Sequence, residues 1–318
     1  MKFGTVRFAD GVQGGVVVGA DGQSVHPLGR DLESVLLEAD TLEAVLRVGA
    51  VASERPAVSL SDVTVRKPFT PAAIRDFVAF EEHVVGVRKS VDGSSGVPEQ
   101  WYAAPTFYFT NPHAIYGPDE PIARPDLCRA LDFELEVAAV IGRQCRSVDE
   151  AQARDAIIGY TIFNDWSARD LQSAEMKVGL GPAKGKDFAS SLGPWLVTAD
   201  ELEDHRDADG FLELDCSVSV NGVEVGHDSL ANMGWTFETM VAYASRDSIV
   251  KPLDILASGT TGGGGCLAEL WGRGGSQHPP SLQPGDLVTI TVDGLGTLST
   301  PIVAGARTPE LTPFRRRS

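Results

Sequence analysis

Two Asx-Gly dipeptides, each between runs of alternating apolar and polar residues, constrain the fold of this chain more than any other feature. Asn221-Gly222 interrupts LELDCSVSVNGVEVGHDS, and Asp293-Gly294 interrupts GDLVTITVDGLGTLSTPIV. Asn-Gly and Asp-Gly favour the tight turns that join neighbouring antiparallel strands, and the alternation of period two is typical of strands. The sequence therefore predicts a main body built on β-hairpins, with helical periodicity in fewer segments, such as GWTFETMVAYASR.

The first 65 residues predict a separate small unit. MKFGTVRF and GGVVVGADG read as short strands closed by an Asp-Gly turn, and LESVLLEADTLEAVLRVGA carries helical periodicity. The Pro- and Ser-containing segment SERPAVSLSDVTVRKPF connects this unit to the rest of the chain. We expect an α+β protein, with a small N-terminal α/β domain over residues 1–65 and a β-rich domain over residues 66–318.

Charge and composition exclude several classes of function. The net charge of −17 argues against binding to nucleic acid or to an anionic membrane. No apolar run is long enough to span a bilayer, and the first residues lack the pattern of a secretory signal. The four cysteines are scattered without a C-x-x-C pair, so neither a disulfide scaffold nor a zinc site is expected. A cytoplasmic enzyme is the expectation.

Acidic residues alternate along the segment LDFELEVAAVIG, which reads as one long strand. The alternation puts Asp132, Glu134 and Glu136 on one face. Neighbouring carboxylates in such a strand repel each other unless a cation lies between them. A solvent-facing edge strand is the alternative interpretation of this segment taken alone.

A second acid follows the apolar strand in YTIFNDWSARDLQSAEMK. Helical spacing after Asn164 would place Asp165, Arg169 and Gln172 on a single face. An N-cap and a simple Asp–Arg pair would explain two of these residues. They would not explain an acid at the end of a strand that reads as buried.

Two glycine-rich segments also suggest a binding site. GLGPAKGKDFASSLGPW lacks the spacing of a phosphate-binding P-loop but places Lys184 and Lys186 among glycines. ASGTTGGGGCLAELWG would let backbone amides approach a ligand, and we expect it to lead into a strand that carries Glu269. A flexible hairpin loop is the alternative for this second segment.

The stretch DFVAFEEHVVGVRK contains an isolated histidine among acids and aliphatic residues. If the stretch is helical, Asp76 and His83 lie on one face, two turns apart. Taken alone, the stretch equally suits a solvated amphipathic helix.

These motifs together resemble the fumarylacetoacetate hydrolase family, in spacing and in residue type, over about residues 66–305. The matching segments share the family's order along the chain: Asp76-Phe77 with His83, the E-x-E of Glu134 and Glu136, the D-x-S-A-R-D-x-Q of residues 165–172, the G-K-x-F lysine Lys186, Ser258-Gly259-Thr260, and the G-C-x-x-E-L of residues 265–270. The resemblance implies a β-rich domain of this family's mixed β-sandwich roll type, and usually a homodimer.

The resemblance also assigns roles to residues. The implied metal ligands are Asp76, Glu134, Glu136 and Asp165. The implied catalytic residues are the general base His83, with Glu269 accepting its other ring N–H, and Lys186. The expected substrate contacts are Arg169, Gln172, Thr260 and Arg88. Four carboxylates without histidine or cysteine form a hard oxygen site, which suits Mg²⁺, with Ca²⁺ or Mn²⁺ as alternatives.

The expected function is metal-dependent hydrolysis of a C–C bond in a small anionic 1,3-diketo acid of aromatic or tyrosine catabolism. Fumarylacetoacetate is one candidate, and an acylpyruvate such as fumarylpyruvate is another. Val78 and Met176 stand where fumarylacetoacetases proper are expected to carry tyrosines, which weakens the case for fumarylacetoacetate itself; Tyr102 or Tyr108 could substitute.

Two other functions remain open from the sequence. An isomerase or decarboxylase of 2-hydroxymuconate-type diacids is the main alternative, and the pairing of His83 with Glu269 favours hydrolysis over it. A non-catalytic module that binds metal only for stability predicts a missing ligand or base, and none of these residues is missing.

Overall fold

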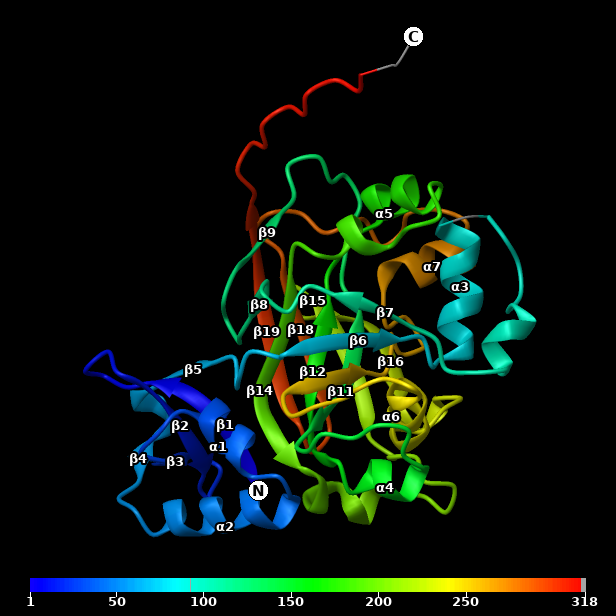
Figure 1. Cartoon of the computed structure of the whole chain (residues 1–318). Helices are drawn as coiled ribbons and strands as arrows, with labels where there is room; N and C mark the ends of the chain where they lie inside the picture. The colour runs from blue at the N-terminus through cyan, green and yellow to red at the C-terminus, as the bar shows by residue number, and fades with distance from the viewer. Residues whose placement is uncertain (92, 316–318) are drawn as a thin grey trace.

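The computed structural model describes residues 1–91 and 93–315, and it is a mixed α+β structure (Figure 1). The described chain forms a large mixed sheet, a smaller five-stranded sheet and a two-stranded ribbon. The α+β class predicted from the sequence is confirmed. Among the described residues, no helix is long and apolar enough to cross a membrane.

The large sheet runs through the N-terminal part and the main body. Its twelve strands within the described ranges are β1 (Lys2–Arg7), β2 (Gln13–Val18), β3 (Ser24–Pro27), β4 (Val58–Ser59), β5 (Thr64–Arg66), β6 (Ala73–Phe77), β7 (Phe107–Thr110), β8 (Ile115–Tyr116), β11 (Leu135–Ile141), β12 (Ile157–Asp165), β14 (Ser190–Thr198) and β17 (Asp254–Ala257). Their order is β4-β3-β2-β1-β14-β12-β11-β17-β6-β7, with β5 on β1 and β8 on β14. The central strands β11, β12 and β14 are buried on both faces, so they read as almost continuous apolar runs.

The five-stranded sheet contains both predicted hairpins. Its strands are β9 (Ile122–Arg124), β15 (Asp215–Val220), β16 (Val223–Ser229), β18 (Leu287–Val292) and β19 (Gly296–Ala304). Asn221 and Gly222 both have positive φ, as a two-residue type I′ turn requires. Side chains of both sheets, such as Ile162 and Val218, belong to one apolar core, so the two sheets pack face to face as a sandwich.

The N-terminal residues extend the large sheet instead of forming a sheet of their own. Strand β1 pairs antiparallel with β14, with Lys2 opposite Val197. The predicted single helical run is two helices, α1 (Leu32–Glu38) and α2 (Leu42–Ser53), because the Thr41 side chain caps the backbone of a new helix. The division after residue 65 stays a prediction.

The remaining helices gather at opposite ends of the sandwich. They are α3 (Glu81–Val91), α4 (Glu150–Arg154), α5 (Arg169–Met176), α6 (Phe237–Ser245) and α7 (Leu267–Gly274), and the short 3₁₀ helices are η1 (Leu60–Asp62), η2 (Glu99–Tyr102), η3 (Ala183–Gly185), η4 (Ala199–His205) and η5 (Leu230–Asn232). Figure 1 shows α3, α5 and α7 together at one end and α4 at the other. Helices α3 and α7 contact each other, as do α4 and α6. The motifs singled out in the sequence lie mostly at the end with α3, α5 and α7.

Candidate active site

Neighbouring strands bring the four predicted ligands to one end of the large sheet. Asp76 lies in β6, which pairs in parallel with β17, and its Cα partner is Ala257. Strand β17 also pairs with β11, which carries Glu136, and β11 pairs with β12, which ends at Asp165. Sheet pairing therefore brings together residues that are up to about 90 positions apart in the sequence.

Three predicted local structures around these acids are wrong. Asp76 belongs to a strand and His83 to the helix that follows, so they are not on one helical face. Asp165 ends β12, and α5 begins only at Arg169 after the short strand β13 (Ser167–Ala168). The acidic strand is also broken in two, with β10 (Leu131–Asp132) paired to β13 apart from β11. Asp132 and Asp165 are each the last residue of a strand, so neither continues the regular element that the sequence predicted.

Asp76, Glu134 and Glu136 form a compact group of buried carboxylates. One oxygen from each lies within 4.8 Å of the others, and all three side chains are buried. Buried oxygens of Asp76, Glu136 and the nearby Asp165 have no hydrogen-bond partner. Such oxygens are costly to bury unless a cation or a proton satisfies them. The group therefore fits a divalent cation with oxygen ligands.

Repulsion within the group changes the pKa values of its members. Burial, followed by the charges of Glu136 and Asp165, raises the pKa of Asp76 well above its usual range. Burial and the charge of Glu134 raise the pKa of Glu136 in the same way. Carboxylic acids with raised pKa values hold protons that a bound cation would displace.

Two buried cations offset part of the negative charge. Lys186 contacts Glu134 and donates to Asp165 Oδ2 at 2.6 Å. Arg169 lies 2.7 Å from Glu134 Oε1 and 2.8 Å from Asp132 Oδ2. Burial acts to raise the pKa of Glu134, but the charges of Lys186 and Arg169 outweigh it and lower that pKa to about 2. Glu134 is therefore ionised at neutral pH.

His83 and Glu269 meet because α3 and α7 pack at very close range. A Cβ atom on Gly272 would lie 2.0 Å from the carbonyl oxygen of Gly86, and a Cβ on Gly86 would lie 2.5 Å from the Glu269 side chain. Both positions therefore require glycine. Gly86 lies one turn after His83, so this contact places the histidine beside Glu269.

The histidine faces a carboxylate oxygen that has no other partner. His83 Nδ1 lies 3.7 Å from Glu269 Oε2, which is buried and unpaired. That separation is longer than an N–H···O hydrogen bond but leaves no room for another group in between. The predicted strand around Glu269 is wrong, because Glu269 lies in the first turn of α7. The apolar run after the glycines was too short to distinguish strand from helix.

Sequence reasoning missed two residues around this pair. The Sγ atom of Cys266, the N-cap of α7, lies 3.7 Å from His83 Nδ1. Arg273 forms ion pairs with both Glu82 and Glu269, through the Glu269 oxygen that faces away from His83. Arg273 therefore ties α3 to α7 and leaves Glu269 Oε2 directed at the histidine. In the sequence, the spacing of four residues between Glu269 and Arg273 could have indicated this ion pair, provided that the segment was recognised as a helix.

Three of the acids, Asp76, Glu134 and Glu136, line one cavity of about 300 Å³ together with the histidine and both buried cations. Asp165 and Glu269 lie behind this lining. Gln172 and Thr260 also line the cavity, and Gln172 accepts a hydrogen bond from Arg169 at 3.1 Å. Arg88 does not line it, since its guanidinium donates to the carbonyl of Gly96 at 2.6 Å. The substrate contact expected of Arg88 stays a prediction.

Of the two tyrosines considered as substitutes, only Tyr108 lines the cavity, and its hydroxyl donates to Asp165. Burial, followed by the charge of Asp165, raises the pKa of Tyr108 well above its usual range, so the phenol keeps its proton. Tyr102 is exposed and donates to Glu81 instead. Lys184 lies on the surface, paired with Asp187.

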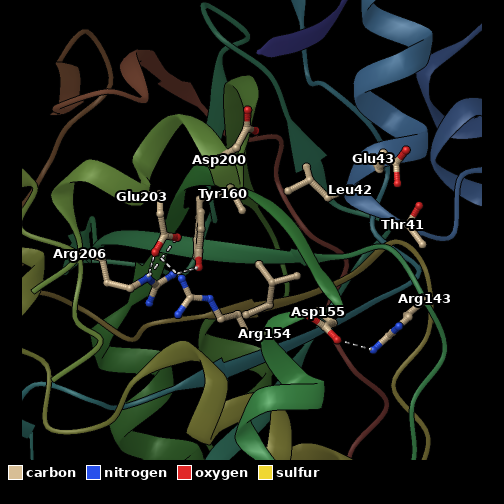
Figure 2. Close-up of a pocket in the computed structure, with 12 residues that line it drawn as sticks. Thr41, Leu42, Glu43, Arg143, Arg154, Asp155, Tyr160, Asp200, Glu203 and Arg206 are labelled. Atoms are coloured by element: carbon tan, nitrogen blue, oxygen red, sulfur yellow. Dashed lines mark hydrogen bonds and ion pairs between the residues drawn. The ribbon is translucent and has the colours of Figure 1, made fainter. Parts of the chain in front are cut away.

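A second, larger cavity of about 490 Å³ lies between the start of α2 and the 3₁₀ helix η4 (Figure 2). Its arginines are all paired with acids. Arg206 lies 2.9 Å from Glu238 Oε1, Arg154 contacts Glu203, and Arg143 lies 3.5 Å from Asp155. The charges of these arginines are therefore compensated within the protein.

Comparison with known proteins agrees with the geometry of the acidic cavity. The model of the fumarylacetoacetate (FAA) hydrolase C-terminal family matches residues 72–303, which is more than half of the chain. The chain belongs to this family. A protein of Mycobacterium tuberculosis is 36% identical over 201 residues, which cover 63% of this chain and 67% of that protein. Relatives from Burkholderia species match over about 60% of their own length.

Solved structures of related enzymes have the same fold. The fumarylacetoacetate hydrolase of Exiguobacterium antarcticum is 25% identical with a TM-score of 0.70. The 2-hydroxyhepta-2,4-diene-1,7-dioate isomerase of Mycobacterium marinum is 25% identical with a TM-score of 0.69. A maleylpyruvate hydrolase of Sphingobium, in complex with manganese and pyruvate, is 23% identical with a TM-score of 0.69, a likeness of fold alone. Each match covers 96% of this chain and 100% of the other chain.

Proposed function

We propose that this protein is a divalent-metal-dependent hydrolase that cleaves a C–C bond in a small 2,4-diketo acid. The observation that carries the proposal is the orientation of His83, whose Nδ1 faces the unpaired, buried Oε2 of Glu269. A carboxylate close to Nδ1 favours the tautomer that carries its proton there, which would leave Nε2 as a base for water. The fumarylacetoacetate hydrolase among the related structures is consistent with such chemistry.

The unpaired oxygens of Asp76, Glu136 and Asp165, together with Glu134, are the proposed ligands of Mg²⁺, with Mn²⁺ or Ca²⁺ as alternatives. The bound cation would supply Lewis-acid polarisation of a substrate carbonyl. Lys186 and Arg169 reduce the excess negative charge of the ligands, which lets an anionic substrate approach. Gln172 and Thr260 offer hydrogen bonds to the substrate's polar groups.

In the proposed reaction, His83 Nε2 removes a proton from water, and the resulting hydroxide attacks the carbonyl carbon. Collapse of the tetrahedral adduct breaks the C–C bond, and the bonding electron pair leaves with the other carbon as an enolate. Lys186 stabilises the charge that develops there. The proton held by His83 then returns to the products, so that two carboxylic acids leave the site.

The alternative function is isomerisation or decarboxylation of 2-hydroxymuconate-type diacids, and the likeness to the isomerase of Mycobacterium marinum supports it. These reactions need no attacking water. The pairing of His83 with Glu269 is taken to favour hydrolysis, since hydrolysis needs a base that removes a proton from water. A homodimer and a cytoplasmic location stay predictions.

The test is an ultraviolet assay of turnover by the Mg²⁺-loaded protein on fumarylacetoacetate, fumarylpyruvate and an acylpyruvate whose acyl group is uncharged, with product identification. We expect cleavage into two acids that EDTA abolishes. His83→Ala should lower kcat by about 10²–10⁴-fold with cation binding retained, whereas His113→Ala, at an exposed histidine, should not. Metal-dependent conversion of a hydroxymuconate-type diacid without cleavage of any diketo acid would establish the alternative.

A further inference from the structure

The acidic cavity has two chemically different ends. Its acidic and basic lining residues, which include Asp76, His83 and Lys186, are no more than 5% exposed and form the base. The partly exposed lining residues at the mouth are mostly apolar: Val78, Val87, Phe107, Met176 and Pro182. A ligand anchored at the base therefore extends past apolar side chains before it reaches solvent.

Among the described lining residues, no charged side chain belongs to the mouth. Of the cations next to these residues in the sequence, Arg88 donates to Gly96 and Lys184 is paired with Asp187 at 2.8 Å. Lys177, which follows Met176, is exposed and does not line the cavity. Between the lining residues Met176 and Pro182, the side chains of Val178 and Leu180 are 74% and 78% exposed. The apolar character of the mouth thus continues onto the surface.

An anionic group at the mouth would lose water without gaining a partner, which is unfavourable. An apolar group at the same place would remove both itself and the protein's apolar side chains from water, which is favourable. The polar groups that recognise a 2-oxo acid are all at the base, where the buried cations and unpaired carboxylate oxygens lie. The cavity therefore fits a ligand that has a polar 2-oxo acid group at the base and an apolar group at the mouth.

We propose that this protein selects monocarboxylic 2-oxo acids whose far end is an uncharged apolar chain or ring, and discriminates against diacids. The proposal rests on the proposed function for the 2-oxo end of the ligand. Within that substrate class it favours acylpyruvates with an alkyl or aryl acyl group over fumaryl compounds, which end in a second carboxylate. Met176, Val87 and Val78 are the specificity-determining residues.

The test uses two ligands that cannot be cleaved as diketones and differ only at the far end. These are 2-oxohexanoate, which ends in a methyl group, and 2-oxoadipate, which ends in a carboxylate. Titration calorimetry of the Mg²⁺-loaded protein should show that 2-oxohexanoate binds at least about tenfold more tightly. Equal binding, tighter binding of 2-oxoadipate, or binding of neither ligand would overturn the proposal.

A cation introduced at the mouth should reverse the preference. Met176→Arg is expected to tighten 2-oxoadipate binding by about tenfold, and Val87→Arg gives a second route if the former misfolds. Val223→Arg, which makes the same change at a valine 67% exposed on β16, is the control and should change neither affinity. If both mouth variants are folded by circular dichroism and the ratio of the affinities for 2-oxohexanoate and 2-oxoadipate is unchanged in both, the proposal is contradicted.

Failure of the proposed function looks different. In that case the binding preference and its reversal by Met176→Arg persist, but no diketo acid is cleaved. Failure of the specificity proposal instead leaves cleavage intact with no preference, or with a preference for diacids.

Discussion

Two cavities in the described part of the chain, the acidic one and the arginine-lined one, hold many charged side chains but differ in how those charges are compensated. In the larger cavity, Arg206, Arg154 and Arg143 each have an acidic partner (Figure 2). In the smaller one, buried oxygens of Asp76 and Glu136 have none, although Lys186 and Arg169 lie nearby. Ion pairs contribute little or moderately to stability. A buried charge without a partner destabilises the folded protein until a ligand compensates it. The presence of unpaired buried charges, and not cavity volume, therefore distinguishes the candidate active site from the other cavity.

The largest expected effect is on stability, and it tests whether the unpaired oxygens need a cation. At one fixed concentration, about 1,000 times its Kd at pH 8, Mg²⁺ should raise the free energy of unfolding by about 4 kcal/mol at that pH. We expect a larger rise at pH 8 than at pH 5.5, measured by chemical or thermal denaturation against EDTA. KCl at the same ionic strength as the Mg²⁺ solution serves as the control.

The sign of this pH dependence follows from the raised pKa values. The folded-state pKa values of Asp76 and Glu136 are above those of the unfolded chain, so the cation-free protein loses stability as pH rises towards them. Glu134 has the opposite sign, but its window lies between its folded pKa of about 2 and its unfolded value near 4.3, below the tested range. A bound cation replaces the displaced protons. Stabilisation that is the same at both pH values would contradict this explanation.

A matched pair of substitutions sharpens the contrast between the cavities. Glu136→Gln removes a proposed ligand and should weaken divalent-cation binding by at least about 100-fold. Even substitution of a residue that only hydrogen-bonds to a metal ligand lowers metal affinity by about 10–100-fold. Glu203→Gln makes the same change in the arginine-lined cavity, where Glu203 is already paired, and should leave cation affinity unchanged. Calorimetric titration with Mg²⁺ or Mn²⁺ measures both. Similar losses in the two variants would show that the acids act only through overall charge.

A smaller effect is expected from two arginines that each hold a glutamate. Arg273→Ala frees Glu269 to turn away from His83, so kcat should fall by about tenfold, while cation affinity should stay unchanged. This loss is smaller than the whole contribution of a general base, which is about 10²–10⁴-fold. Arg154→Ala loosens the pair with Glu203 in the other cavity and should change kcat little. The pH profile of kcat/KM separates orientation of the base from general damage, because only the former shifts its acidic limb. An unaltered profile in Arg273→Ala would assign Arg273 a purely structural role.

The sequence predicted the parts of the fold and site that short segments encode. The alternation around Asn221-Gly222 predicted a hairpin, and the structure confirms it in β15 and β16. The spacing of Glu134 and Glu136 predicted two carboxylates on one side of a strand segment, and both line the cavity. Local predictions failed at the end of β12, where Asp165 lies, and at the start of α7, where Glu269 lies. A short apolar run next to polar residues suits either a strand or a helix.

What the sequence determined by itself is the set of acids, the lysine, the histidine and the hairpins, since their order and spacing suffice to recognise the family. Only the tertiary structure decided which charges remain unpaired, that Arg88 lies outside the cavity, and that the mouth is apolar. The physical reason is that pairing and burial depend on contacts between distant segments, such as Gly86 against Gly272. The free energy of a buried charge is set by those contacts, and the pattern of neighbouring residues does not contain them.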